Sequence, residues 1–375
     1  MVALTQENYR KYVDKYFLRT KEILQKENLN PYAKYQVFCR DEWVKALGIK
    51  EAIDIITKFA KGVEIYAVDE GDRLLSKDTI MTIYAPVQEI VDLETLYLGV
   101  LARAITSKGE TKHVDLKSVY ERMSRIVELI KGRDIIYMGA RHWHYEEDAE
   151  IAEACFKAGV KSCSTDIGGE KNGTEGVGTI PHALECIYHW KFGIDNAVEQ
   201  ATLAFDRCID QSVPRVALID YANREIYDTF HTCSSMAYRN KISAGGLSKT
   251  RLNGIRIDTC GENWMQNVPK VKADKYYLNS GVCVWGVNDL VRKLNDAYGI
   301  DRPKVILSSG FGDYDKVKAY VDYEKQIGYK LFDTLGIGAV YDCIITTADI
   351  VEIDGDEIHK IGRPFRPNPA LRRVV

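Results

Sequence analysis

The stretch "KVILSSGFGDYDKVKAYVDYEKQIGYKLFDTLGIG" (304–338) contains two apolar runs on either side of a segment with helical spacing. The runs at 304–310 and 330–338 read as strands, and residues 315–327 read as a helix. A glycine turn follows the first strand, and "GIG" ends the second. This stretch therefore predicts a strand–helix–strand unit of an α/β fold.

The same alternation extends over about 200 residues of the chain. Six apolar strands separated by helices are expected at 134–140, 161–165, 215–221, 254–259, 304–310 and 330–338. Such a series is typical of a (β/α) barrel or of a doubly wound sheet. We expect an α/β protein built on an irregular (β/α) barrel.

The flanking segments do not follow this alternation. Residues 1–91 mix helices and strands irregularly, which indicates an α+β domain. The segment "DIVEIDGDEIHKI" (349–361) reads as a hairpin with an Asp354–Gly355 turn. The predicted division is an N-terminal α+β domain over 1–105, a barrel-like catalytic domain over 106–345, and a hairpin and tail over 346–375 that pack back on the first domain.

Composition excludes several classes of function. The 375 residues are 46% hydrophobic and 28% charged, with a net charge of −3, so a folded protein without a nucleic-acid surface is expected. No run of about 18 apolar residues indicates a membrane span, and the charged N-terminus has no apolar signal core. The nine dispersed cysteines, without a C-x-x-C pair, are typical of reduced thiols in a cytoplasmic protein.

Polar residues follow several of the predicted strands. Asp220-Tyr221 and Asp258-Thr259 end two of them, and "SSGFG" and "GIG" end the last two. Catalytic residues of barrels lie at the carboxyl ends of strands, so these positions predict one convergent site. The backbone N–H groups around the two glycine motifs are suited to a phosphate; tight turns without a ligand are the alternative.

Two further motifs suggest anion binding. The stretch "IGGEKNGTEGVGTIPHAL" (167–184) has five glycines within residues 168–178, which would let an anion approach, with Lys171 adding charge. A surface loop without a ligand is the alternative. In "RHWH", either His142 and His144 bind a metal ion, or Arg141 binds an anion and the histidines are incidental.

Taken together, these motifs resemble those of the nicotinate phosphoribosyltransferases, in the archaeal-type branch. The matching pieces are "DKYFLRT" (14–20), "MGARH" (138–142), "GVGTIPHAL" (176–184), "IRIDT" (255–259), "LSSGF" (307–311) and "GIG" (336–338). The resemblance implies a barrel joined to an N-terminal domain, and a homodimer with shared sites. It also implies the transfer of phosphoribose from phosphoribosyl pyrophosphate to nicotinate, coupled to ATP hydrolysis through a phosphohistidine.

The resemblance also implies roles for individual residues. His182 would carry the phosphoryl group, with Asp220 to orient it, and Asp258 would hold ribose hydroxyls or Mg²⁺. Arg141 would pair with the nicotinate carboxylate, and Tyr16 would stack on the pyridine, reaching across the dimer. Residues placed near the phosphates are Thr179, Ser309, Gly310, Gly336 and Gly338. The implied cofactors are Mg²⁺ and ATP.

The chain departs from the family pattern mainly around the base. Met138 and His142 stand where the family has phenylalanine and a second arginine, whereas the histidine motif is intact. Ser309, Tyr221 and Ala339 are further departures. The alternatives are a phosphoribosyltransferase for quinolinate or another base, a metal-dependent hydrolase built on His142 and His144, and a non-catalytic sugar-phosphate or nucleotide sensor.

Overall fold

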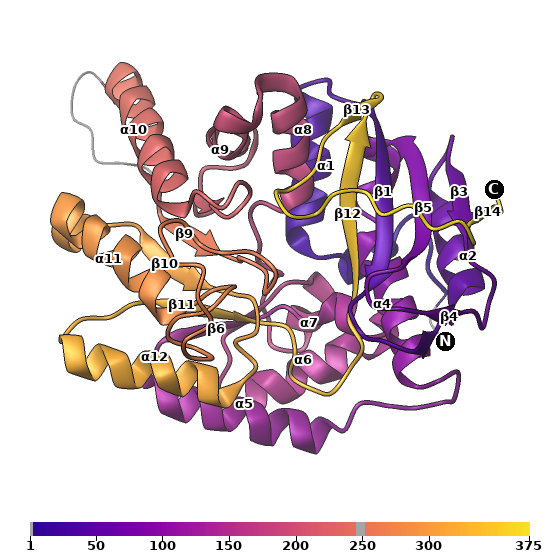
Figure 1. Cartoon of the computed structure of the whole chain (residues 1–375), viewed down its shortest axis with the longest axis horizontal. Coiled ribbons are helices and arrows are strands. Elements are labelled where there is room, and N and C mark those ends of the chain that lie inside the picture. Colours follow the sequence, from indigo (N-terminus) through magenta and orange to yellow (C-terminus); the bar gives the residue numbers. More distant parts are fainter. Residues whose placement is uncertain (1–2, 245–251) are drawn as a thin grey trace. The chain divides into compact units, whose positions relative to one another are not determined.

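The computed structural model describes residues 3–244 and 252–375, which form two compact units (Figure 1). The first comprises Met1–Glu121, Tyr137–Gly178 and Gly338–Val375, and the second comprises Arg122–Ile136 and Thr179–Ile337. The expected division at residues 105 and 345 stays a prediction. No helix in the described ranges is long and apolar enough to cross a membrane.

The first unit contains most of the N-terminal elements and the last three strands. Its elements are η1 (Tyr9–Tyr12), α1 (Lys15–Lys26), β1 (Tyr32–Cys39), β2 (Val44–Lys45), α2 (Ile49–Phe59), β3 (Glu64–Ala67), β4 (Arg73–Leu74), β5 (Thr79–Pro86), α3 (Val87–Ile90), α4 (Glu94–Thr106), η2 (Ala140–His142), η3 (Tyr145–Glu147), α6 (Asp148–Lys157), β7 (Ser162–Cys163), α7 (Asp166–Glu170), β12 (Thr346–Ile353), β13 (Asp356–Glu357) and β14 (Arg372–Arg373). Helix α5 (Leu116–Ile130) and strand β6 (Asp134–Tyr137) lie across the boundaries of the two units.

The second unit contains the later β/α elements. They are α8 (His182–Phe192), η4 (Ile194–Asn196), α9 (Ala197–Cys208), β8 (Val216–Leu218), α10 (Glu225–Ala244), β9 (Gly254–Ile257), α11 (Val284–Tyr298), η5 (Gly299–Asp301), β10 (Lys304–Leu307), α12 (Tyr314–Ile327) and β11 (Thr334–Ile337).

An antiparallel sheet forms the centre of the first unit, in the order β13-β12-β1-β5-β3-β14. The C-terminal strand β12 lies beside β1, with Ala33 opposite Ile353 (Figure 1). The expected hairpin is confirmed, since β12 and β13 are joined through Asp354 and Gly355. Both turn residues have positive φ, 47° and 88°, as the tightest hairpin turns require.

Helix α4 is buried along nearly its whole length in this unit. A Cβ added at Gly99 would lie 2.3 Å from the carbonyl oxygen of Trp143, so only glycine permits the observed approach of the 140–143 segment. The Thr346 hydroxyl on β12 donates to the Leu98 carbonyl at 2.9 Å. Helix α4 is thereby fixed against both the sheet and η2.

A parallel sheet forms the centre of the second unit, with the strand order β6-β11-β10-β9-β8. Helices α10, α11 and α12 follow β8, β9 and β10 along the chain, which confirms the predicted alternation (Figure 1). A closed barrel is not confirmed, because the described strands form an open sheet with an edge at β8. The alternation of strands and helices is common to both architectures, so the sequence pattern did not distinguish them.

The glycine-rich stretch differs from the expected open loop. Residues Asp166–Glu170 form the short helix α7, and Gly168 and Gly169 are buried within it. A Cβ at Gly169 would lie 2.3 Å from the Thr174 carbonyl oxygen, and one at Gly176 would lie 2.7 Å from the Thr165 carbonyl carbon. These glycines allow the segment to pack closely on itself, and the approach of an anion to this stretch stays a prediction.

Candidate active site

The second unit brings together the histidine and one of the predicted carboxylates. His182 is the first residue of α8, and Asp220 follows β8. Their side chains meet, with 3.1 Å between His182 Nε2 and Asp220 Oδ1. Asp220 is fully buried, whereas the His182 side chain is 27% exposed. A buried carboxylate in this position fixes the orientation of an accessible imidazole ring.

Thr179 is held in the segment just before the histidine. Its hydroxyl donates to the Val216 carbonyl of β8 at 2.9 Å. Arg256 on β9 donates from Nη2 to the carbonyl of Ile180 at 3.2 Å. The Thr179 side chain therefore fastens the segment to the sheet, and two strands fix the approach to His182.

Asp258 lies at the carboxyl end of β9, as expected from the sequence. Ser308 Oγ donates to Asp258 Oδ1 at 2.9 Å, and Arg256 Nη1 lies 3.3 Å from Asp258 Oδ2. The carboxylate is thus oriented by a hydroxyl and a guanidinium, and its side chain remains 23% exposed. Such a group can accept hydrogen bonds from hydroxyls or contribute an oxygen ligand to a cation.

Ser309 and Gly310 form a turn in which both residues have left-handed backbone conformations, with φ of 70° and 82°. Sequence reasoning missed Lys316, two residues into α12, whose Nζ donates to the Ser309 carbonyl at 2.8 Å. Burial lowers the pKa of Lys316 to about 8. A lysine six residues beyond the strand-end Gly310, in the first turn of the following helix, is the sequence signal that could have identified this cation.

The second glycine motif lies at the end of β11, as expected from the sequence. Gly336 lies within strand β11, and Gly338 follows it. A Cβ at Gly338 would lie 2.4 Å from His142 Cε1 and 3.0 Å from the Met138 carbonyl oxygen. Gly338 therefore packs against the histidine ring, and the expectation that its backbone N–H binds a phosphate stays a prediction.

The first unit brings together Tyr16 and Arg141, the two residues expected to bind the base. The Arg141 guanidinium carbon lies 5.9 Å from the centroid of the Tyr16 ring. Tyr16 is 8% exposed, whereas 31% of the Arg141 side chain is accessible. The ring lies near the arginine of its own chain, and the expectation that Tyr16 reaches across a dimer stays a prediction.

Sequence reasoning also missed the carboxylate that contacts Arg141. Arg141 Nη1 donates to Glu94 Oε1 at 2.7 Å. Glu94 is buried, and this burial raises its pKa to about 8 despite the opposing effect of Arg141. The sequence shows that Glu94 is an acidic residue at the start of an apolar helix. It does not show that Arg141 is its partner.

Gly178 lies close to Tyr16. A Cβ added at Gly178 would lie 3.0 Å from the Tyr16 backbone nitrogen and 3.2 Å from its Cδ1 atom. Arg19, one helical turn further along α1, donates to the Gly178 carbonyl. Within the glycine-rich stretch, Gly178 thus packs against Tyr16, and the next residue, Thr179, begins the segment that leads to His182.

The histidines of "RHWH" do not share a metal site. His142 packs on Gly338, whereas His144 Nε2 lies 3.0 Å from Glu51 Oε1 on α2. Within residues 3–244 and 252–375, no group of three or more His, Cys, Asp or Glu side chains is arranged to hold a metal ion.

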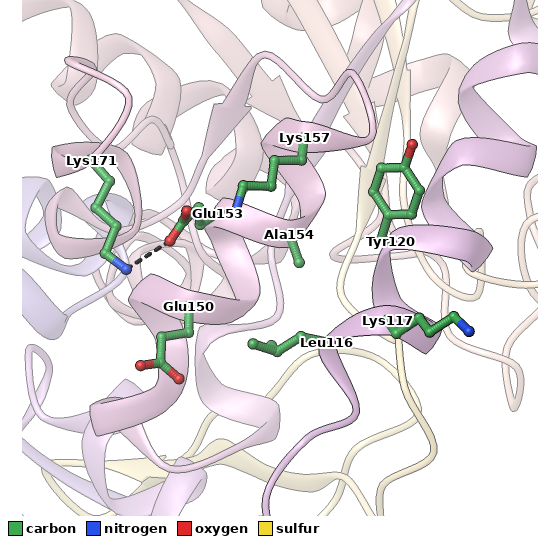
Figure 2. A pocket seen from close by; sticks show the side chains of 8 residues that line it. All are labelled: Leu116, Lys117, Tyr120, Glu150, Glu153, Ala154, Lys157 and Lys171. Atoms are coloured by element: carbon green, nitrogen blue, oxygen red, sulfur yellow. Dashed lines mark hydrogen bonds and ion pairs between the residues drawn. The ribbon is translucent and has the colours of Figure 1, made fainter.

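A surface hollow of about 460 Å³ lies on the first unit between the start of α5 and helix α6 (Figure 2). It is lined by Leu116, Lys117, Tyr120, Glu150, Glu153, Ala154, Lys157 and Lys171. Lys171, expected to add charge to an anion site, points toward Glu153 at 2.7 Å. None of the predicted catalytic or phosphate-binding residues lines this hollow.

Comparisons with known proteins identify a family model for the N-terminal part of the chain and solved structures with a similar fold. Residues 14–105 match the family model described as the N-terminal domain of quinolinate phosphoribosyl transferase. The structure resembles nicotinate phosphoribosyltransferase from Vibrio cholerae, with a TM-score of 0.65, 14% identity, and coverage of 94% of this chain and 87% of that one. It also resembles nicotinate phosphoribosyltransferase from Porphyromonas gingivalis, with a TM-score of 0.62, 14% identity, and coverage of 93% and 92%.

Among curated proteins, no relative matches the chain. The family model thus matches the N-terminal part of the chain, and the solved structures show that its fold is shared with nicotinate phosphoribosyltransferases.

Proposed function

We propose that this phosphoribosyltransferase-like chain transfers phosphoribose from phosphoribosyl pyrophosphate to nicotinate, as a step in the formation of NAD. The ring nitrogen of nicotinate forms a bond to C1 of the ribose while the bond from C1 to pyrophosphate breaks. The products are nicotinate mononucleotide and pyrophosphate. The observation that carries the proposal is the partly exposed Arg141 side chain, whose guanidinium carbon lies 5.9 Å from the centroid of the Tyr16 ring.

This pair suits an aromatic carboxylate. A guanidinium group presents N–H donors in a plane, which matches the geometry of a carboxylate. A tyrosine ring next to it offers a flat apolar face for a pyridine. We assign the carboxylate of the base to Arg141 and its ring to Tyr16.

The second unit contains groups that suit the phosphoribosyl donor. Lys316 and Arg256 supply positive charge, and the turn at Ser309 and Gly310 supplies backbone N–H groups. These donors would stabilise the charge that develops on departing pyrophosphate. Asp258 would accept hydrogen bonds from the ribose hydroxyls or stabilise the positive charge that develops on the ribose.

The residues present also suit Mg²⁺ that arrives with the pyrophosphate. Mg²⁺ usually keeps several waters and binds through one or two carboxylates together with substrate phosphates. Asp258, which is partly exposed and already oriented, is the carboxylate that fits this role. When bound, the metal ion would neutralise charge on the leaving group.

We further propose that ATP hydrolysis is coupled to the reaction through His182. The imidazole would accept the γ-phosphoryl group of ATP as the bond to ADP breaks, and water would later release phosphate. The contact with Asp220 at 3.1 Å supports this role, because the carboxylate orients the ring and stabilises its positively charged form.

Quinolinate is the second candidate base, since the matching family model is that of quinolinate phosphoribosyl transferase. The test measures pyrophosphate release from the purified chain with nicotinate or quinolinate, each with and without ATP. We expect turnover with nicotinate that ATP stimulates, and a His182→Ala variant that retains slower, ATP-independent turnover. Turnover with quinolinate alone would reassign the base, and unchanged ATP stimulation in the variant would refute the phosphohistidine.

The cellular setting is also part of the proposal. All nine cysteines are free thiols, which supports a reducing compartment such as the cytoplasm. A homodimer remains our expectation from the family resemblance, and light scattering of the purified chain tests it.

A further inference from the structure

The contact between Glu94 and Arg141 stands out because an acidic side chain is buried against the residue that we assign to the base. Glu94 is the first residue of α4, and 6% of its side chain is exposed. Its Oε1 atom accepts a hydrogen bond from Arg141 Nη1 at 2.7 Å. Arg141 is the more accessible member of this pair, with 31% of its side chain exposed.

The elements that carry the two residues cannot easily move apart. Gly99, on the same helix as Glu94, allows the Trp143 carbonyl to approach to a distance that any side chain would prevent. The Thr95 hydroxyl donates to Asp14 at 3.0 Å, which joins the start of α4 to the residue before α1. Glu94 therefore holds Arg141 from a rigid support.

Long arginine side chains lose considerable rotamer freedom when they bind a ligand. An arginine that is already oriented by a buried acceptor pays less of this entropy when a carboxylate arrives. The remaining N–H donors of the guanidinium fork keep a fixed direction, which favours a planar anionic group over other ligands.

We propose that Glu94 is a positioning residue that orients Arg141 for the carboxylate of the base and thereby sets the affinity for that base. This inference rests on the proposed assignment of Arg141 to the base carboxylate. Glu94 does not touch the reacting atoms in this proposal, and it acts only through the arginine.

The charge of Glu94 adds a property that a purely structural contact would lack. The charged groups that face it are Arg141 on η2, Asp349 on β12 and Asp14 before α1. Burial and the two aspartates raise the pKa of Glu94 to about 8, against the effect of Arg141. Below this pH the protonated Glu94 leaves the full positive charge of Arg141 for the base, and above it the ionised carboxylate opposes the incoming anion.

The test compares Glu94→Ala and Glu94→Gln with the wild-type chain in steady-state assays of phosphoribosyl transfer. The alanine variant should raise the KM for nicotinate about tenfold or more, with the KM for phosphoribosyl pyrophosphate within about twofold. The glutamine variant keeps a hydrogen-bond acceptor, so it should recover most of the affinity at pH 7. It should also abolish the rise in nicotinate KM that the wild type shows above about pH 8.

Glu324→Gln provides a matched control. Glu324 is a buried carboxylate paired with Arg133, with 2.6 Å between Arg133 Nη2 and Glu324 Oε2, and it has no role in the proposed chemistry. This variant should lower the thermal midpoint while leaving the nicotinate KM and its pH profile unchanged. If Glu94→Ala does not fold, the glutamine variant and the wild-type pH profile still decide the question.

Two results would overturn the inference while the proposed function stands. One is that both Glu94 variants keep the nicotinate KM of the wild type while Arg141→Ala raises this KM. The other is an equal rise in the KM for both substrates, which indicates general damage to the fold. A wild-type chain without any turnover of nicotinate refutes the proposed function itself, and the inference falls with it.

Discussion

Replacement of Gly178 by alanine tests whether the glycine-rich stretch places the tyrosine that we assign to the base. The new Cβ would lie 3.0 Å from the Tyr16 backbone nitrogen and 3.2 Å from its Cβ and Cδ1 atoms. Ordinary contact begins near 3.4 Å, so the tyrosine or the loop has to move by about 0.4 Å. The nearest atom belongs to the backbone of α1, so rotation of the tyrosine side chain cannot relieve the contact.

The expected cost follows from this crowding. Overpacking of a buried contact destabilises a protein by about 1–3 kcal/mol. If about 1.4 kcal/mol of this cost falls on the position of the Tyr16 ring, the KM for nicotinate rises about tenfold. The thermal midpoint should fall by about 2–4 °C for each kcal/mol lost from a unit of this size.

The assay measures initial rates of pyrophosphate release while one substrate is varied and the other is saturating. The nicotinate KM should rise, whereas the KM for phosphoribosyl pyrophosphate should stay within about twofold. Gly261→Ala is the matched control, because a Cβ there meets no atom within 4 Å. Unchanged values of both KM in the Gly178 variant, or an equal rise in both, would show that this contact does not govern binding of the base.

Three further predictions concern the second unit. Asp220→Asn removes the charge beside His182 and should lower the ATP-stimulated rate about tenfold or more. This is the loss expected when a charged hydrogen bond of about 1.5–3 kcal/mol is removed. An equal loss of the rate without ATP would contradict a role of Asp220 in ATP coupling. Lys316→Met should raise the KM for phosphoribosyl pyrophosphate about tenfold to a hundredfold. Because the pKa of Lys316 is lowered to about 8, the affinity of the wild type for phosphoribosyl pyrophosphate should fall above that pH. The same fall in affinity in the Lys316→Met variant would contradict the assignment of Lys316 to this substrate. Burial raises the pKa of Glu225 from 4.5 to about 7, so its contribution to stability is present below pH 4.5 and lost as the pH rises toward 7. Between pH 5 and 8 the urea midpoint should fall less in Glu225→Gln than in the wild type. An equal fall in both proteins would show that the Glu225 carboxyl does not titrate in this range.

The sequence predicted those features that depend on local pattern. Alternating apolar strands and helices predicted the parallel sheet of the second unit, and Asp354-Gly355 predicted the hairpin turn. The pairing of His182 with Asp220 was expected from the family resemblance, and the two side chains meet in the structure.

The remaining features depend on neighbours that are distant in the sequence. Gly178 and Gly338 were interpreted as glycines of anion-binding motifs, and the structure adds that Tyr16 and His142 lie close to them. Glycine permits open space and close packing equally well, so its presence alone cannot distinguish the two. The sequence did not identify Glu94 as the partner of Arg141, because the contact joins residues that are 47 positions apart.

The position of β12 in the middle of the antiparallel sheet has a consequence for synthesis on the ribosome. Its partner β1 is made early, whereas β12 follows every element of the second unit. At about 5–20 residues per second, β1 waits roughly 15–60 s for its neighbour. During that interval one edge of β1 offers unpaired backbone groups to any other nascent chain. The yield of folded protein in a cell should therefore depend on chaperones that bind the emerging N-terminal strands, and a slower translation rate should increase that dependence.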